Sequence, residues 1–89
     1  MEKRQQLEAI EKMLRELEDV KNSQESLLKK VAQIEAENMN VGVSLLEKEL
    51  PDVHEQADAN IQRLSLLLDK LQLHRDDFVK KHKLDVVEA

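Results

Sequence analysis

Apolar residues recur at alternating intervals of three and four in the first part of the chain. The pattern consists of Ile10, Met13, Leu17, Val20, Gln24, Leu27, Val31, Ile34 and Asn38, of which Gln24 and Asn38 are polar. Residues with this heptad spacing lie on one face of an α-helix. Neither Gly nor Pro occurs from residue 3 to residue 38, so the pattern predicts one long helix over 3–38. Three further leucines, at positions 7, 14 and 28, lie on one shoulder of this face and widen it, as is typical of helical bundles.

The pattern stops at residues 39–43, which include Asn40 and the only glycine of the chain, Gly42. Both residue types can adopt the left-handed conformation that ends a helix. The sequence therefore predicts a turn over 39–43. Ser44 and Glu47 then match a capping box, which predicts that a second helix starts at residue 44.

The second predicted helix runs over 44–83 and is followed by a frayed tail over 84–89. Its inward-facing seam is mostly apolar and consists of Leu50, His54, Ala57, Ile61, Leu64, Leu68, Leu71, Arg75 and Phe78. Pro51 removes one helical hydrogen bond and clashes with the preceding turn. We therefore expect the helix either to kink at Pro51 or to restart at Asp52, which begins another capping box with Glu55.

Two long helices joined by a short turn predict an all-α fold, an antiparallel two-helix hairpin (coiled coil) that forms a single domain over 1–89. Folding about residue 41 places Gln24 opposite Ala57 and Asp58. The same register predicts apolar contacts between Met13 and Leu17 on the first helix and Leu64, Leu68 and Leu71 on the second. A three-helix bundle, with breaks near Asn22 and Pro51, is the alternative.

Six leucines lie among the ten residues from Leu64 to Leu73, too many for one seam. If Leu64, Leu68 and Leu71 contact the first helix, then Leu66 and Leu73 face nearly away from it, and Leu67 lies on the border. Exposed apolar stripes on small proteins often mark interaction sites. We therefore predict that Leu66, Leu67 and Leu73 form a protein-interaction surface.

Composition narrows the function classes. The net charge is −5, from 14 basic and 19 acidic residues, and the longest basic cluster is the short stretch 80–83. This charge balance and the single aromatic residue argue against nucleic acid as a partner. The chain has no cysteine, which favours a reducing compartment, the cytoplasm or the nucleus. It also has no apolar run of about 20 residues, so we expect no membrane partner.

Candidate chemistry is sparse. His54 with Asp58, and His74 with Asp77, could each place two metal ligands on one helical face, but no third ligand converges in sequence. The chain lacks the glycines of a phosphate-binding loop or a nucleophile elbow. We expect no enzyme activity and no catalytic residue, cofactor, bound metal or small-molecule ligand.

A family resemblance adds one alternative. The step Leu50-Pro51-Asp52, followed by a leucine-spaced helix, resembles the second helix of tubulin-binding cofactor A, a small helical chaperone. The resemblance covers only part of the chain, and residues 3–38 depart from the family's pattern. It implies a chaperone or sequestering factor that presents the leucine-rich face to a client.

The residues themselves favour a non-enzymatic coiled-coil module for protein interaction or scaffolding. A chain of 89 residues has a small core, and association adds stability. We expect the leucine-rich face to mediate either a homodimer, most simply a four-helix bundle, or docking with another helical subunit. A further alternative is that the chain is a segment of a longer helical rod.

Overall fold

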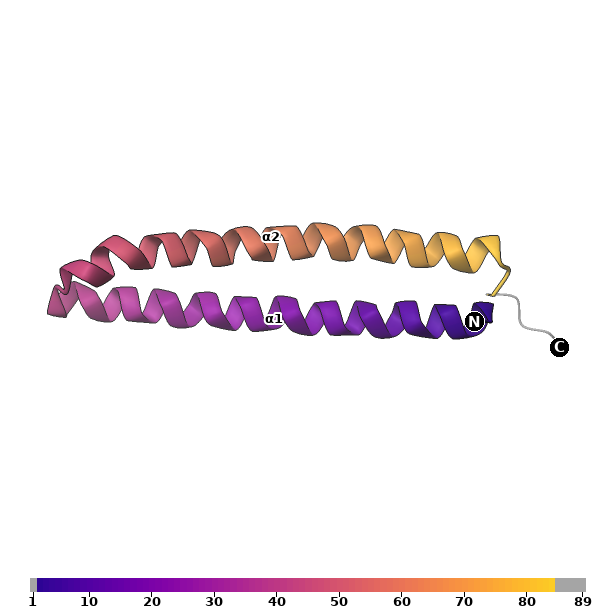
Figure 1. Ribbon diagram of the computed structural model, residues 1–89, viewed down its shortest axis with the longest axis horizontal. Helices are drawn as coiled ribbons and strands as arrows, with labels where there is room; N and C mark the ends of the chain where they lie inside the picture. Colours follow the sequence, from indigo (N-terminus) through magenta and orange to yellow (C-terminus); the bar gives the residue numbers. More distant parts are fainter. Residues whose placement is uncertain (1, 85–89) are drawn as a thin grey trace.

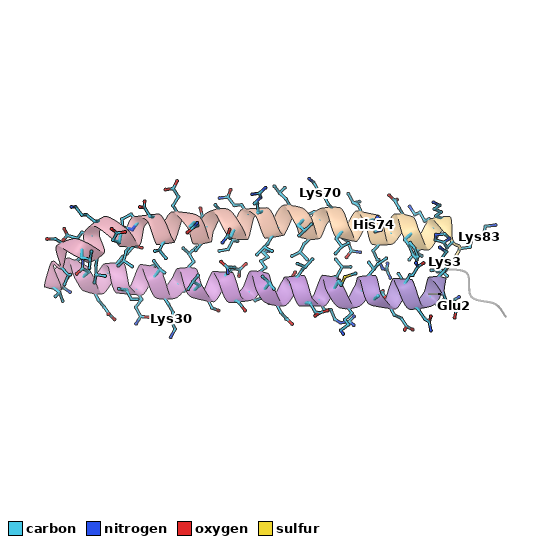
Figure 2. The ribbon with its side chains drawn as sticks, viewed as in Figure 1. Glu2, Lys3, Lys30, Lys70, His74 and Lys83 are labelled. Carbon is cyan, nitrogen blue, oxygen red and sulfur yellow. The ribbon has the colours of Figure 1, made fainter. Side chains whose placement is uncertain are left out.

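The computed structural model describes residues 2–84 and contains two helices, α1 (Lys3–Val41) and α2 (Ser44–Lys81). The helices run side by side in opposite directions and are joined by a turn at one end (Figure 1). Lys3 and Lys83 lie together at the other end (Figure 2). The molecule is a rod of 67 × 20 × 17 Å. The predicted antiparallel hairpin is confirmed, whereas its pairing into a four-helix bundle remains a prediction.

The turn between the helices consists of Gly42 and Val43. Gly42 adopts the left-handed conformation, with φ 74° and ψ 36°, and its N–H donates to the carbonyl oxygen of Asn38 at 2.7 Å. The N–H of Glu47 donates to the carbonyl oxygen of Val43 at 3.1 Å and starts α2. The turn predicted over 39–43 is therefore too long, because residues 39–41 complete α1.

Val43 is the residue that precedes α2, and no side chain caps this helix end. The capping box predicted at Ser44 and Glu47 is therefore wrong, since Ser44 already lies inside the helix. The backbone N–H of Val43 is instead bound by Asn38, the last inward-facing residue of α1.

The Asn38 side chain closes the turn. Its Oδ1 accepts from the N–H of Val43 at 2.9 Å, and its Nδ2 donates to the carbonyl oxygen of Val43 at 3.1 Å. Asn38 is only 6% exposed and is the one polar residue among the described residues that is buried. A buried amide is costly unless its donors and acceptors are paired. The backbone of Val43 satisfies both groups, so Asn38 ties the end of α1 to the start of α2.

Pro51 lies inside α2, which continues without interruption from residue 44 to residue 81. Neither a restart at Asp52 nor the capping box predicted there occurs. Figure 1 shows the start of α2 inclined toward the end of α1. The three-helix alternative is wrong, because Asn22 and Pro51 both lie within continuous helices. Helix α2 ends two residues before the predicted boundary at 83. Of the predicted tail over 84–89, only Leu84 is described, and the others lie outside the described residues.

The seam of α2 contains the predicted residues, which are all half-buried or buried. The seam of α1 differs from the prediction. Its inward-facing positions are Leu7, Ile10, Leu14, Leu17, Lys21, Gln24, Leu28, Val31, Glu35 and Asn38. The predicted seam residues Met13, Val20, Leu27 and Ile34 are instead exposed by 42–48%. Helix α1 is therefore rotated so that the predicted shoulder leucines form the contact with α2.

The register also differs slightly from the prediction. Gln24 lies near Asn60, with Nδ2 of Asn60 at 3.5 Å from Oε1 of Gln24, rather than opposite Ala57 and Asp58. The turn at Gly42 and Val43 lies nearer the carboxyl end than the predicted fold point at residue 41, so each residue of α1 faces a slightly later residue of α2.

The core of the hairpin is thin. Among the described residues, the buried apolar side chains are Ile10, Val31 and Ala57, at 9%, 5% and 3% exposure. No large side chain in residues 2–84 is fully buried. Two helices can cover only one side of each other, so most seam residues keep an edge in contact with solvent.

We expect Asn38→Ala to lower the free energy of unfolding by about 1–3 kcal/mol, because it leaves the Val43 backbone groups without their side-chain partners. Urea unfolding followed by circular dichroism measures this loss. Asn40→Ala is the matched control, since Asn40 is exposed on the same helix and its replacement should change stability by less than about 0.5 kcal/mol. Equal effects of the two substitutions would contradict the role assigned to Asn38.

Candidate interaction surface

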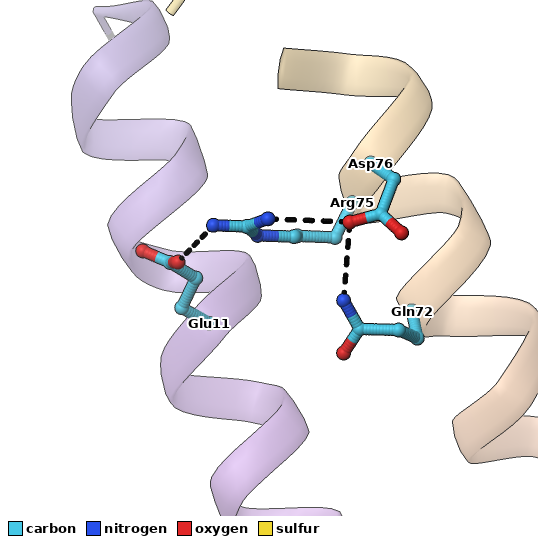
Figure 3. Close-up of polar contacts among 4 residues, drawn as sticks. All are labelled: Glu11, Gln72, Arg75 and Asp76. Atoms are coloured by element: carbon cyan, nitrogen blue, oxygen red, sulfur yellow. Dashed lines mark hydrogen bonds and ion pairs between the residues drawn. The ribbon is translucent and has the colours of Figure 1, made fainter. Parts of the chain in front are cut away.

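One side of the hairpin is polar. The guanidinium of Arg75 donates from Nη2 to Oε2 of Glu11 at 2.7 Å and from Nη1 to Oδ1 of Asp76 at 3.2 Å (Figure 3). Gln72 donates to the same Asp76 oxygen at 3.1 Å. These hydrogen bonds, first that to Glu11 and then that to Asp76, raise the pKa of Arg75 further above its usual value. A groove on this side is also lined by Arg15, Glu18 and Asp69.

Polar pairs also lie within the seam. Nδ1 of His54 lies 2.7 Å from Oε1 of Glu35, and both side chains are partly exposed. This contact uses one of the histidines of the predicted two-ligand pairs. At the open end of the hairpin, the rings of Phe78 and His82 lie 4.6 Å apart. Desolvation, and then the charges of Lys3 and Lys81, lower the pKa of His82.

The opposite side of the hairpin is apolar. Helix α1 contributes Met13, Val20, Leu27 and Ile34, which lie seven residues apart, and α2 contributes Val53 and Leu67. Heptad spacing keeps each set on one side of a coiled coil. The two sets lie on the same side, because Val20 lines one groove together with Asn60, which lies midway between Val53 and Leu67. We call these six residues the apolar face; their exposure is 42–48%.

The predicted interaction residues divide between two surfaces. Leu66 and Leu73 are 60% and 64% exposed, the highest values among the large apolar residues of α2 after Leu45. At their positions on the helix they point away from α1. Leu67 is 46% exposed and belongs to the apolar face. The predicted exposure of all three is therefore confirmed, and their role in binding stays a prediction.

Sequence reasoning missed the contribution of α1 to this surface. The signal was present, since Leu7, Leu14 and Leu28 form a second heptad row, offset by one position from the predicted row that includes Met13. Both rows flank the position of Ile10, one on each side. The sequence pattern favoured the row of Met13 as the contact with the second helix, because Lys21 and Glu35 interrupt the row of Leu14.

Further exposed apolar side chains lie near the turn, on different sides of the helices. Met39, Val41 and Leu45 are 85%, 73% and 65% exposed. A shallow hollow beside them is lined by Leu46, Leu50 and Pro51, among others. Its lining contains both apolar and polar side chains, and we assign no binding or catalytic role to it.

Within residues 2–84, no group of three or more His, Cys, Asp or Glu side chains is placed to hold a metal ion. Neither helix, over its described residues, is both long and apolar enough to cross a bilayer. Comparison with protein-family models, with curated proteins and with solved structures finds no match. The resemblance to tubulin-binding cofactor A gains no support from these comparisons.

The neighbouring leucines of α1 test its rotation. We expect Leu28→Ala to lower the free energy of unfolding by roughly 2 kcal/mol, because Leu28 contacts α2. Leu27→Ala should change it by less than about 0.5 kcal/mol, because Leu27 is 45% exposed and lies outside the seam. Urea unfolding at low micromolar concentration, where association contributes least, measures both. A larger loss for Leu27→Ala would show that α1 is rotated as the sequence pattern predicted.

Proposed function

We propose that the chain is a non-enzymatic helical module that binds other proteins through its exposed apolar side chains. The observation that carries this proposal is the contrast between surface and core. Three apolar residues are buried, whereas twelve large apolar residues among the described ones are at least 40% exposed. Exposed apolar surface of this extent favours association, since each such side chain gains free energy when it leaves water.

The distribution of these residues supports helix packing as the mode of binding. Six of the twelve form the apolar face, a stripe that runs along both helices. Partner helices dock through such regularly spaced positions, as in four-helix bundles. Leu66 and Leu73 give α2 a second, smaller apolar surface on the side away from α1.

Affinity capture tests this proposal. The tagged chain is expressed in cells and compared with Val20→Glu/Leu27→Glu, which changes the apolar face, and with Leu66→Glu/Leu73→Glu, which changes the outer side of α2. A second copy with a different tag is co-expressed, and captured proteins are quantified by mass spectrometry. We expect the captured amount of at least one protein, either the second copy or another helical protein, to fall about tenfold with one of the two variants. The reason is that a buried charge is costly.

Asn22→Glu/Gln33→Glu is the control, since it adds the same two charges at exposed polar positions of α1. Circular dichroism checks that helix content is unchanged in all variants. Capture of the same proteins in the same amounts by the wild type and by both apolar-surface variants would contradict the proposal. A captured client held by the monomer would favour the chaperone alternative over scaffolding.

A further inference from the structure

We infer that the occupant of the apolar face is a second copy of this chain, packed face to face with its turn at the opposite end. In this dimer, α1 lies antiparallel on α1 of the other copy, and α2 lies on α2. The two-fold axis lies between the two copies, perpendicular to the helices and near the middle of their length. The inference rests on the proposed function and specifies its partner. It is carried by a symmetry in the residues of the apolar face and in the charges along its edges.

The apolar row of α1 is symmetric about its midpoint. In an antiparallel pair, Met13 faces Ile34 of the other copy, and Val20 faces Leu27. The residues three positions further along lie on the outer edge of the face, and they are Glu16, Ser23, Lys30 and Glu37, all exposed. In the antiparallel pair Glu37 lies level with Ala9, which carries no charge. Figure 2 shows Lys30 on the edge of α1 that faces away from α2. Reversing this edge about Ser23 pairs Glu16 of each copy with Lys30 of the other.

Helix α2 has the same kind of symmetry. Its row on the apolar face has Val53, Asn60 and Leu67 at the centre and Leu46 and His74 at the ends. Reversal about Asn60 pairs Val53 with Leu67, and Leu46 with His74. The outer edge of α2 consists of Glu49, Gln56, Arg63, Lys70 and Asp77, all exposed. Asp77 lies past the end of the paired stretch. Reversal pairs Glu49 with Lys70, and Gln56 with Arg63. Lys70 lies on the edge of α2 that faces away from α1 (Figure 2).

The two centres of symmetry lie at the same height in the hairpin. The row of α1 is centred between Val20 and Leu27, and that of α2 is centred on Asn60. Asn60 contacts Gln24, which lies between the two central residues of the α1 row. A single two-fold axis can therefore satisfy both helices at once, which a two-fold dimer requires.

The dimer also gives a role to Asn60, the polar residue between Val53 and Leu67. On the axis, it meets Asn60 of the other copy, and each amide can both donate and accept. A lone Asn among apolar contacts is a common device that fixes register in coiled coils. The charge pairs along the edges also fix the register, because other registers place like charges together.

The other two-fold arrangement places both turns at the same end and packs α1 on α2 of the other copy. Asn60 then faces the apolar row of α1 of the other copy, which offers its amide no polar partner beyond Gln24 of its own chain. Glu37 of one copy also lies level with Glu49 of the other, which places like charges together. The face-to-face dimer with opposite turns avoids both conflicts.

The size of the face suits a dimer. From Met13 to Ile34 the row extends about 31 Å along the helix, and the hairpin is 20 Å wide. The contact therefore covers about 600 Å² on each copy, at the lower edge of the range for specific complexes.

Cysteine cross-linking tests the orientation, since the chain has no cysteine of its own. Asn60→Cys places the two thiols together on the axis, within reach of a disulfide. His74→Cys lies in the same row two heptads further on and is also exposed, but its symmetry mate lies at the far end of the dimer. We expect at least tenfold more disulfide-linked dimer from Asn60→Cys than from His74→Cys.

Charge exchange tests the edge pairing independently. Glu16→Lys and Lys30→Glu each place like charges at both α1 edges of a homodimer. We expect each to raise the dimer Kd by roughly three- to tenfold, in sedimentation equilibrium at low salt. Mixing the two variants should restore the wild-type Kd, because every edge pair in the mixed dimer is again of opposite sign.

A wild-type chain that remains monomeric at about 100 μM overturns this inference. In that case the proposed function still stands if the apolar-surface variants capture less of a different protein. The inference and the proposed function both fail if the variants capture every protein in the same amount as the wild type. A dimer that forms equal amounts of disulfide from Asn60→Cys and His74→Cys, or in which mixing the charge variants restores nothing, also overturns the opposite-turn arrangement.

Discussion

Two helices cannot enclose a core between them, and this limit determines most features of the hairpin. Each helix contacts the other along one stripe, and residues in that stripe remain open to solvent at the edges. Over residues 2–84 the buried apolar residues are accordingly few, namely Ile10, Val31 and Ala57. The other apolar side chains of both helices are half-buried in the seam or exposed. A chain of this kind gains stability when a further helical surface covers them.

Polar residues supply the specificity that the thin core cannot. Arg75 binds Glu11 from the opposite helix, His54 contacts Glu35, and Asn38 binds the backbone of the turn. Exposed ion pairs contribute little to stability. They do require particular residues to lie opposite one another, so they disfavour sliding of one helix along the other.

The two long sides of the hairpin differ in character. One carries the Arg75 network and several acidic residues, and the other carries the apolar face. This difference gives the rod one surface suited to water and one suited to another helical surface. Along the edges of the apolar face the charge changes from acidic to basic between Glu16 and Lys30 on α1 and between Glu49 and Lys70 on α2, which is the pattern that an antiparallel copy would match.

The sequence alone determined the helical hairpin, the position of the turn to within a few residues, and the exposure of Leu66, Leu67 and Leu73. Heptad spacing, one glycine and the absence of other helix breakers were sufficient, because these are local properties of the chain. The rotation of α1 was decided only by the tertiary structure. The rows that contain Leu14 and Met13 both flank Ile10, but the row of Met13 is apolar throughout whereas the row of Leu14 includes Lys21 and Glu35, so the local pattern favoured the wrong row. Packing against α2 selects the row of Leu14, which places Leu7, Leu14 and Leu28 in the seam and Glu35 beside His54. This choice leaves the row of Met13 free to form the apolar face.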